Sequence, residues 1–524
     1  MPALQVNKLS YQLNNGIKLF ENISFTLPQG LTGLVGRNGV GKSLLASIIT
    51  KEIEPTSGSV SSDLTVLSFN QYNSIHFKKD DTIGSFLGVA QQLAALTRIE
   101  QGSCEEADFE LLGDNWQIKQ KVLKILKSLQ LPANVEHLCL SLSGGERAKL
   151  HLWSLFQSNA QLLVLDEPSN HLDKQGKYWL IKQLKKFQGN VLVVSHDREL
   201  LKEVDSIYEL TSLGLTIYNS TYSDYLSTKQ NKDEALTKQL LHLKKQKSKV
   251  LNQAQKSKER AQKRASQGNK LRNNGSQAKV LLDGKKNKAE GAASGKISKT
   301  KTQVSAIDSK QTVILKQQEQ LKPLSLSMHH EKSKKTQQLW VEDLVLPFGC
   351  QEPINLKVMS NEKYHLFGKN GSGKSTLMKV LLGELIPING IVHLNTPVFY
   401  FDQYFSLLNG QLTMLDNIKN YCAHLNDSDS RTILAGIGFR GDKVFTQVEQ
   451  LSGGEKMRLM ILMMSHQYEL PLLLLDEPDN HLDIESKEVL ANSLNEFNGS
   501  FIIISHDEYL IKAIDDVLKI QLIN

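Results

Sequence analysis

Two glycine-rich segments carry residues that could bind the phosphates of a nucleotide. They read GRNGVGKS at 36–43 and GKNGSGKS at 368–375, and each stands between a short apolar run and an apolar helical pattern. Glycine lets backbone N–H groups approach phosphates closely, and the positive end of a helix favours their negative charge. This context predicts two P-loops, in which Lys42 and Lys374 reach the β- and γ-phosphates.

Two pairs of adjacent carboxylates could supply the rest of the chemistry. They end the segments LLVLDE at 162–167 and LLLLDE at 472–477, whose apolar runs are typical of buried strands. The first acid of each pair, together with the P-loop serine, would hold Mg²⁺ either directly or through water. Glu167 and Glu477 would orient or deprotonate an attacking water. The magnesium ligands predicted in this way are Ser43, Ser375, Asp166 and Asp476.

The motifs recur in one order, which indicates that the chain contains a duplicated domain. LSGGE at 142–146 returns at 451–455, the P-loops lie 332 residues apart, and the LDEP and SHD motifs each lie 310 residues apart. The first copy has about 23 additional residues between its P-loop and LSGGE, which we place within 91–120. The predicted fold class is α/β, with two P-loop domains at 1–225 and 336–524 and a linker at 226–335.

The linker is strongly basic and lacks aromatic residues. Residues 226–330 carry 24 Lys and Arg against 7 Asp and Glu, whereas the whole chain has a net charge of only +7. Apolar residues near heptad spacing on both sides of a glycine-studded stretch predict two antiparallel helices with a basic tip. The alternative is a disordered polar tether, since hydrophobicity is low and charge is high. Residues 241–280 hold 12 Lys and Arg and one acid, a composition that could displace counterions from a phosphate backbone.

Together these motifs resemble those of ATP-binding cassette ATPases, over both copies and about 410 residues. The resemblance implies a head-to-tail sandwich, with ATP between the P-loop of one copy and the LSGGE segment of the other. For the first site it implies ATP contacts from Gly36, Arg37, Asn38, Gly39, Val40, Gly41, Lys42, Ser43 and Gln71, with Ser452, Gly453 and Gly454 from the other copy. For the second it implies Phe348, Gly368, Lys369, Asn370, Gly371, Ser372, Gly373, Lys374, Ser375, Thr376 and Gln403, with Ser143, Gly144 and Gly145.

The resemblance also gives roles to a histidine and a glutamine of each copy. His196 and His506 match the family's switch histidine, which contacts the γ-phosphate and the water, so they join the two glutamates as catalytic residues. Gln71 and Gln403 match the Q-loop glutamines and join the magnesium ligands. Phe348 is placed to stack on adenine, whereas Tyr11 and Leu13 both remain open for this role in the first copy. Where the second copy has Thr376 the first has Leu44, so we expect both sites to be competent and the first to be slower.

Two features are similar to the ABC-F subfamily rather than to importers. The D-loops read SNHLD and DNHLD, and the basic linker resembles the ABC-F interdomain linker. That subfamily binds the ribosome through the linker and acts on translation, sometimes protecting against antibiotics. The resemblance therefore implies an ATP-dependent factor that contacts rRNA or tRNA through 241–280 and works as a monomer with an intramolecular sandwich. The alternatives are the cytoplasmic ATPase subunit of a transporter and a DNA-maintenance ATPase.

Composition narrows the class of protein further. The apolar runs are short, such as LLVL before Asp166 and FIII at 501–504, whereas a membrane-spanning helix needs roughly 18 apolar residues. The N-terminus MPALQVNKLSYQ has no apolar stretch of the kind that secretory signals contain. Four cysteines lie far apart without a CxxC pair, which argues against zinc knuckles and favours a reduced, cytoplasmic setting.

Overall fold

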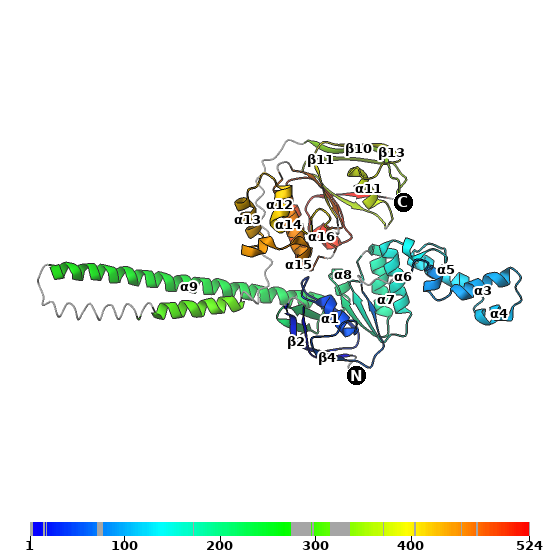
Figure 1. Ribbon diagram of the computed structural model, residues 1–524, viewed down its shortest axis with the longest axis horizontal. Helices are drawn as coiled ribbons and strands as arrows, with labels where there is room; N and C mark the ends of the chain where they lie inside the picture. Colours follow the sequence, from blue (N-terminus) through cyan, green and yellow to red (C-terminus); the bar gives the residue numbers. More distant parts are fainter. Residues whose placement is uncertain are drawn as a thin grey trace. The chain divides into compact units, whose positions relative to one another are not determined.

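The computed structural model describes residues 4–13, 16, 18–70, 77–170, 172–273, 295, 298–314, 336–369, 371–402, 405–451, 453–467, 470–480 and 482–522. The chain divides into two compact units, one of Met1–Tyr222 with Lys322–Asn524 and one of Ser223–Leu321. The first unit contains both copies of the repeated motifs (Figure 1). The domain limits expected from the sequence, 1–225, 226–335 and 336–524, remain predictions.

The first copy is built on a six-stranded sheet in the order β5-β6-β7-β3-β8-β9, parallel except for the β8–β9 pair. Its central strands β3 and β6 are buried along their whole length, as expected for parallel strands covered on both faces. A smaller antiparallel sheet has the order β2-β1-β4. The strands are β1 (Leu4–Gln12), β2 (Lys18–Leu27), β3 (Leu31–Val35), β4 (Ser57–Ser61), β5 (Val66–Phe69), β6 (Leu162–Asp166), β7 (Asn190–Val194), β8 (Ser206–Thr211) and β9 (Gly214–Tyr218).

The helices of the first copy pack on this sheet and on one another. The four that frame the candidate site are α1 (Lys42–Ile49), α6 (Gly144–Phe156), α7 (Lys174–Lys186) and α8 (Arg198–Leu201). A helical region before α6 contains α2 (Ile83–Phe86), α3 (Ala90–Glu100), α4 (Glu106–Leu112) and α5 (Ile118–Leu129). Helices α3 and α4 fall where the additional residues of the first copy were placed. Arg98 Nε joins the two by donating to Asp108 Oδ1 at 3.0 Å.

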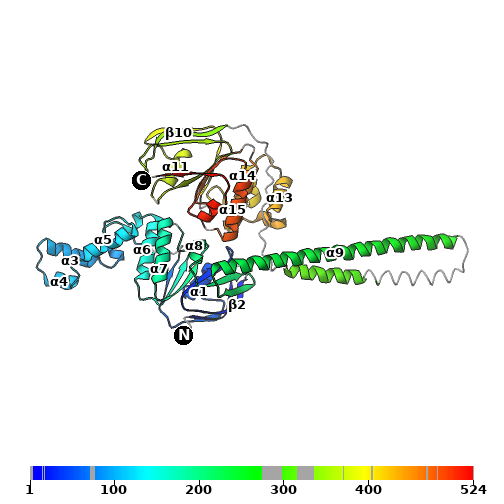
Figure 2. The ribbon, with the colours of Figure 1, turned by 180° about the vertical axis from the view of Figure 1, so that it is seen from behind.

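The second copy repeats this plan with a five-stranded parallel sheet, β14-β15-β16-β12-β17, and an antiparallel sheet, β11-β10-β13. Helices α14 and α15 pack against that sheet through one large apolar cluster (Figure 2). The strands are β10 (Gln337–Val345), β11 (Ile354–Met359), β12 (Lys363–Phe367), β13 (Asn389–Leu394), β14 (Val398–Phe401), β15 (Leu472–Asp476), β16 (Phe501–Ile504) and β17 (Val517–Gln521). The helices are α11 (Lys374–Leu381), α12 (Met414–Tyr421), α13 (Asp427–Gly436), α14 (Gly453–Ser465), α15 (Ile484–Glu496) and α16 (Glu508–Lys512).

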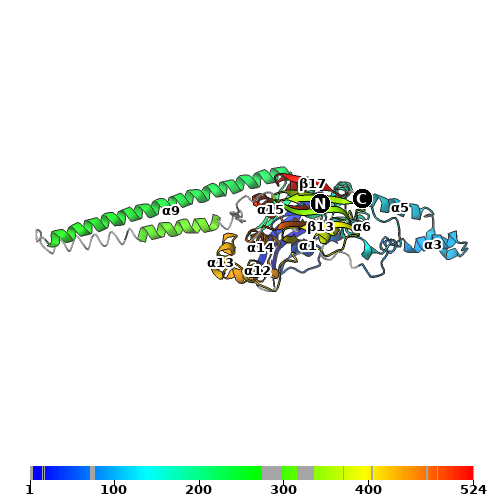
Figure 3. The ribbon, with the colours of Figure 1, turned by 90° about the horizontal axis from the view of Figure 1, so that it is seen from above.

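The second unit is a helical hairpin. Its first helix, α9 (Tyr222–Asn273), is 52 residues long, and residues 298–314 form a helix beside it (Figure 3). Lys247 Nζ on α9 pairs with Asp308 Oδ1 at 2.6 Å, which fixes the register of the two helices. The described part of the hairpin therefore favours the predicted helical linker over a disordered tether. The predicted basic tip lies largely outside the described residues. Of the helices that the structure describes, none is long and apolar enough to cross a membrane.

Candidate functional site

Both P-loops fold their lysine back over the loop. Lys42 Nζ donates to the carbonyl oxygens of Gly36 and Arg37 at 2.8 and 2.9 Å, and Lys374 Nζ does the same to the equivalent carbonyls at 3.0 Å each. Gly41 precedes α1 with a φ of 97°, a left-handed conformation that glycine adopts without strain. Burial lowers the pKa of both lysines, against the raising effect of the nearby LDE carboxylates. The loops therefore hold a preformed cationic cradle at the start of each helix.

The aspartate of each LDE motif faces the P-loop serine. Asp166 is hydrogen-bonded to Ser43, and Asp476 is hydrogen-bonded to Ser375. Burial raises the pKa of both aspartates. Asp166 Oδ1 is buried and makes no hydrogen bond within the described residues, so it is available to a ligand. A hard oxygen donor beside a hydroxyl and a phosphate cradle fits Mg²⁺, which prefers such oxygens.

The glutamates lie beside the histidines of the SHD motifs. His196 Nε2 is 3.7 Å from Glu167 Oε1, and the matching distance from His506 to Glu477 is also 3.7 Å. Burial raises the pKa of each glutamate to about 7. Burial also lowers the pKa of His196 well below its usual value and that of His506 to about 4. At neutral pH each pair thus combines a neutral imidazole with a carboxyl group that titrates near 7.

The backbone separates the two acids of each motif in a way that the sequence did not indicate. The strand ends at Asp166, and Glu167 has a φ of 48°, while Glu477 has a φ of 50°. A left-handed glutamate is uncommon, and residues held in this conformation cluster at functional sites. Asp166 and Glu167 therefore face different partners because the chain turns sharply after the strand.

The described signature residues lie at or next to helix N-termini. Ser143 caps α6, where its backbone N–H donates to Glu146 Oε2 at 2.8 Å and its side chain accepts from the Glu146 N–H. Gly144 and Gly145 form the first turn of α6, and Gly453 and Gly454 form that of α14. Such turns leave N–H groups that can bind an anion. Ser452 lies outside the described residues, as do Gln71, Asn370 and Gln403.

The aromatic expected to stack on adenine lies next to the second P-loop. Phe348 is 68% exposed. Just after it, the backbone N–H of Cys350 donates to the carbonyl of Ser372 within the P-loop at 3.1 Å. In the first copy Tyr11 is half-buried and packs on Phe20, with ring centres 6.3 Å apart. The second copy therefore has an exposed ring next to its P-loop, whereas the ring of Tyr11 in the first copy is partly covered by core residues.

The two copies meet around a small cavity of about 30 Å³. Its walls bring the catalytic candidates of both copies together, with Glu167, His196 and Lys177 on one side and Glu477, His506 and Lys487 on the other. The first P-loop reaches across to the residues that follow the second LDEP motif. The backbone N–H of Asn38 donates to Asp483 Oδ2 at 2.9 Å, and Arg37 pairs with Glu485 at 2.8 Å. Asp173, the counterpart of Asp483, raises the pKa of Lys374 in the second P-loop.

Two partly buried ion pairs at this junction were missed by sequence reasoning. Lys177 pairs with Asp197 at 2.7 Å in the first copy, and Lys487 pairs with Asp507 at 2.8 Å in the second. Burial opposes the charge on these aspartates, yet the lysines leave the pKa of both below the usual value. The repeat did hold a signal, because each lysine stands four residues after the aspartate that ends its SNHLD or DNHLD segment. The pairs fix the aspartate that follows each candidate switch histidine.

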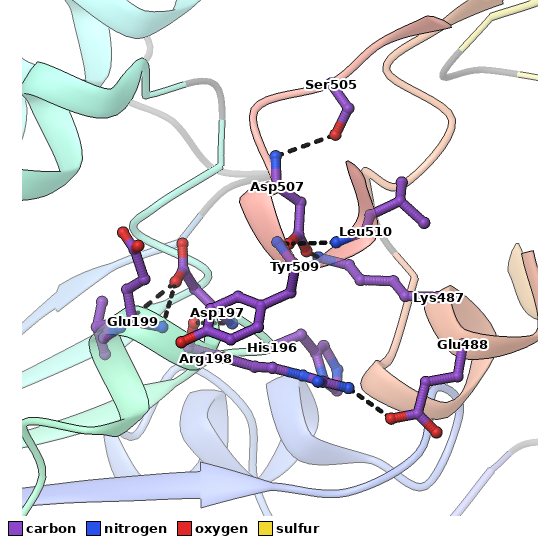
Figure 4. A network of polar contacts seen from close by, with 12 residues as sticks. His196, Asp197, Arg198, Glu199, Lys487, Glu488, Ser505, Asp507, Tyr509 and Leu510 are labelled. Atoms are coloured by element: carbon purple, nitrogen blue, oxygen red, sulfur yellow. Dashed lines mark hydrogen bonds and ion pairs between the residues drawn. The ribbon is translucent and has the colours of Figure 1, made fainter. Parts of the chain in front are cut away.

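A rim of polar contacts surrounds these pairs, and Figure 4 shows part of it. Arg198 Nη2 lies 2.6 Å from Glu488 Oε1 in the other copy, and Lys174 pairs with Glu508. The ring of Tyr509 lies under two cations, with Arg198 at 5.5 Å and Lys202 at 5.1 Å from its centre. In these contacts the cations belong to the first copy, and the carboxylates and the ring belong to the second.

Comparison with known proteins agrees with this arrangement. The ABC transporter family matches residues 20–170 and 351–480, which together make up more than half of the chain. The chain is 28% identical to the uncharacterized ABC transporter ATP-binding protein YfmM of Bacillus subtilis, over 97% of this chain and 96% of that protein. It is 27% identical to ABC transporter F family member 5 of Arabidopsis thaliana, over 95% of this chain and 72% of that protein.

Solved structures share the fold at lower identity. The structure of an RNase-L inhibitor matches with a TM-score of 0.56 and 18% identity, over 98% of this chain and 87% of the other. A structure of ribosome-bound archaeal Pelota and ABCE1 matches with a TM-score of 0.52 and 18% identity, over 98% of this chain and 76% of the other. At such identity the likeness concerns the fold, two cassettes in one chain.

Proposed function

We propose that this chain, which belongs to the ABC transporter family as a tandem-cassette ATPase of ABC-F type, binds the ribosome and modulates translation. The chain hydrolyses ATP, and its cassettes use ATP with Mg²⁺. In the proposal, ATP closes the two cassettes and sets the helical hairpin in its binding pose. Hydrolysis reopens the cassettes and releases the ribosome.

The proposed roles at each nucleotide site follow from the contacts above. Lys42 and Lys374 would bind the β- and γ-phosphates, for which their ammonium groups are already held over the loop carbonyls. The serine and aspartate that meet beside each P-loop would hold Mg²⁺, which neutralises charge on the phosphates when bound. The Q-loop glutamines Gln71 and Gln403 complete this ligand set in the proposal. The signature residues of one cassette would bind the γ-phosphate held by the other.

Glu167 and Glu477 are proposed as the general bases. A base works best when its pKa lies near the working pH, and burial brings both glutamates to a pKa of about 7. His196 and His506 would position the water and the γ-phosphate. The Nε2 atoms of both histidines are buried and make no hydrogen bond within the described residues, so each is available to a substrate.

The observation that carries the ribosomal part of the proposal is the basic helical hairpin. Helix α9 would extend about 78 Å at roughly 1.5 Å per residue. Residues 241–280, most of which lie on it, include 12 Lys and Arg but only one acid, Glu259. Without aromatic rings such a surface binds phosphate and follows groove shape rather than stacking bases. The ribosome, built largely of RNA, is the partner that best fits a surface of this charge and length.

The proposal places the chain in the cytoplasm as a monomer, where its two cassettes pair within one molecule. One solved structure of like fold is that of ribosome-bound archaeal Pelota and ABCE1. The transporter alternative, in which the chain serves a separate membrane protein, predicts instead that it co-purifies with a permease. The two hypotheses therefore differ in the partner that remains attached when hydrolysis is blocked.

The test combines Glu167→Gln with Glu477→Gln, which removes both proposed bases and leaves ATP binding in place. We expect this variant to sediment with ribosomes at about 0.15 M salt when ATP is present and not when ADP replaces it, because the closed state persists. The matched control adds Lys244→Gln, Lys245→Gln, Lys249→Gln and Lys256→Gln on exposed positions of α9. Sedimentation of the double variant free of ribosomes, or binding untouched by the four α9 changes, would contradict the proposal.

A further inference from the structure

We propose that oppositely charged rim residues make each cassette pair with a cassette of the other kind, as in the pair within one chain, rather than with the same cassette of a second copy. The rim consists of Lys174, Arg198 and Lys202 in the first cassette and of Glu488, Glu508 and Tyr509 in the second. The inference concerns which cassettes pair, and it holds whatever partner the hairpin binds.

The cationic side of the rim is built by two helix starts. Lys174 is the first residue of α7, and Arg198 is the first residue of α8. On the anionic side, Glu488 lies in α15 and Glu508 begins α16. Figure 4 shows the guanidinium of Arg198 directed at the Glu488 carboxylate, with the Tyr509 ring beside it. Together with Arg37–Glu485, three ion pairs of the same polarity thus join the cassettes.

The internal repeat shows what these positions become in the other cassette. Helices α7 and α15, and likewise α8 and α16, begin 310 residues apart, as do the motifs that precede them. At this spacing Arg198 is the counterpart of Glu508, so one rim position reverses its charge between the cassettes. Lys174 corresponds to Ile484, and Glu488 corresponds to Tyr178.

The two central ion pairs do not distinguish the cassettes. Lys177 and Asp197 have the same residue types as their counterparts Lys487 and Asp507, and each pair has nearly the same length. Two first cassettes or two second cassettes would therefore present the same two ion pairs as the pair within one chain. The cavity between these pairs differs at Asp479, whose counterpart in the first cassette is Ser169. Selection has to come from positions that differ, and the rim contains them.

Pairing between copies would place like charges at the rim. In a pair of second cassettes, Glu488 of each copy would face Glu508 of the other, so the repulsion occurs twice. In a pair of first cassettes, Lys174 would face Arg198 in the same way. In the pair of first cassettes one contact works in the opposite direction, because Glu199 is the counterpart of Tyr509 and would attract Lys202. In the pair of second cassettes Lys369, the counterpart of Arg37, would likewise attract Glu485. Each same-cassette pair therefore mixes attraction with repulsion, whereas the pair within one chain joins opposite charges at all three ion pairs.

Such exposed pairs are suited to selection more than to stability. Arg198 is 24% exposed and Glu488 62%, so solvent screens their attraction. Charges at an interface rim mainly determine partner choice, since repulsion between like charges weakens binding of the wrong partner and leaves binding of the right partner unaffected. The rim can therefore direct pairing without holding the cassettes shut after hydrolysis.

The test exchanges the reversed position within the full chain, as Arg198→Glu with Glu508→Arg, so that composition and net charge stay the same. Within one chain Lys174 and Glu488 then each face a like charge, whereas pairs between copies become complementary at these positions. We expect the exchanged chain to self-associate in ATP about tenfold more tightly than the parent chain, both carrying Glu167→Gln and Glu477→Gln. Sedimentation velocity at micromolar protein and low salt measures this.

The control exchanges Lys185 and Glu203, an exposed ion pair inside the first cassette, and should leave self-association unchanged. High salt screens rim charges, so the exchanged and parent chains should converge at about 0.5 M salt. Association that is independent of ATP or persists at high salt would overturn the inference, as would an exchanged chain that stays monomeric. Because no ribosome is present, these outcomes are separate from those that test the proposed function.

Discussion

The two cassettes keep the same proposed phosphate-binding and catalytic residues but surround them differently. Each has a lysine folded over its P-loop, an aspartate bonded to the P-loop serine, and a glutamate 3.7 Å from a histidine. The surroundings of the aspartates differ, since Tyr400 Oη donates to Asp476 Oδ2 at 3.3 Å. Its counterpart Ser68 donates instead to Glu52 at 2.8 Å. The two cassettes therefore have the same residues in the proposed reacting positions, but different neighbours around them.

The cavity between the cassettes shows the same difference. Ser169 lines it from the first cassette, and the counterpart in the second is Asp479. Asp479 is buried, its pKa is raised by burial, and its Oδ1 makes no hydrogen bond within the described residues. At this position the second cassette therefore adds a carboxylate, and it raises the pKa of Glu477 alongside the effects of burial and Asp476. Two sites with the same proposed catalytic residues can therefore have different charged groups around them.

Removing one proposed base at a time should have the largest effect, and it should reveal any difference in hydrolysis between the two sites. Glu167→Gln and Glu477→Gln are each expected to lower hydrolysis at their own site about 100-fold or more, since a positioned general base contributes about that much. Because Leu44 leaves the first site with one hydroxyl fewer, we expect Glu477→Gln to lower total turnover more than Glu167→Gln. Single-turnover hydrolysis of bound ATP by each variant measures the two losses. Equal residual rates in both would show that the sites do not differ.

The two sites were predictable from the sequence where spacing alone determines the chemistry. A P-loop places its lysine and serine through local backbone geometry, and apolar runs such as LLVL and LLLL became β6 and β15. The repeat doubled the information, because each motif of one cassette located its partner in the other. Lys42, Asp166 and their counterparts accordingly lie together as expected.

Features that depend on distant partners could not be predicted in this way. The Lys177–Asp197 pair joins residues from a helix and from the turn after a strand, and no local pattern links them. The left-handed φ of Glu167 is imposed by the turn after β6, since glutamate has no preference for it. Helix α9 runs from Tyr222 to Asn273, and heptad spacing did not indicate where it ends, because glycine and polar residues obscure its last turns.

We expect the rate of ATP hydrolysis to depend on pH in the same way at both sites. The pKa of each glutamate is about 7, raised by burial, so the base is protonated and inactive below that pH. We expect kcat/KM for ATP to fall about tenfold between pH 8 and pH 6, following the ionised fraction. His506, with a pKa of about 4, stays neutral over this range and does not contribute. Rates measured in each single Glu→Gln background should give acid limbs that coincide.

A smaller change should separate the two sites at their proposed magnesium ligands. Tyr400→Phe removes the hydroxyl that supports Asp476, and loss of one such hydrogen bond costs about 1 kcal/mol, or roughly fivefold in affinity. We therefore expect about fivefold more Mg²⁺ for half-maximal hydrolysis at the second site, with the first site unchanged.

The matched control is Ser68→Ala, which removes the counterpart hydroxyl in the first cassette. Because Ser68 donates to Glu52 and not to Asp166, this change should leave the Mg²⁺ requirement of both sites in place. Titration of Mg²⁺ in the Glu167→Gln and Glu477→Gln backgrounds assigns each effect to one site. If Ser68→Ala raised the Mg²⁺ requirement of the first site as much as Tyr400→Phe raises that of the second, the Tyr400 hydroxyl would not explain a difference between the two sites.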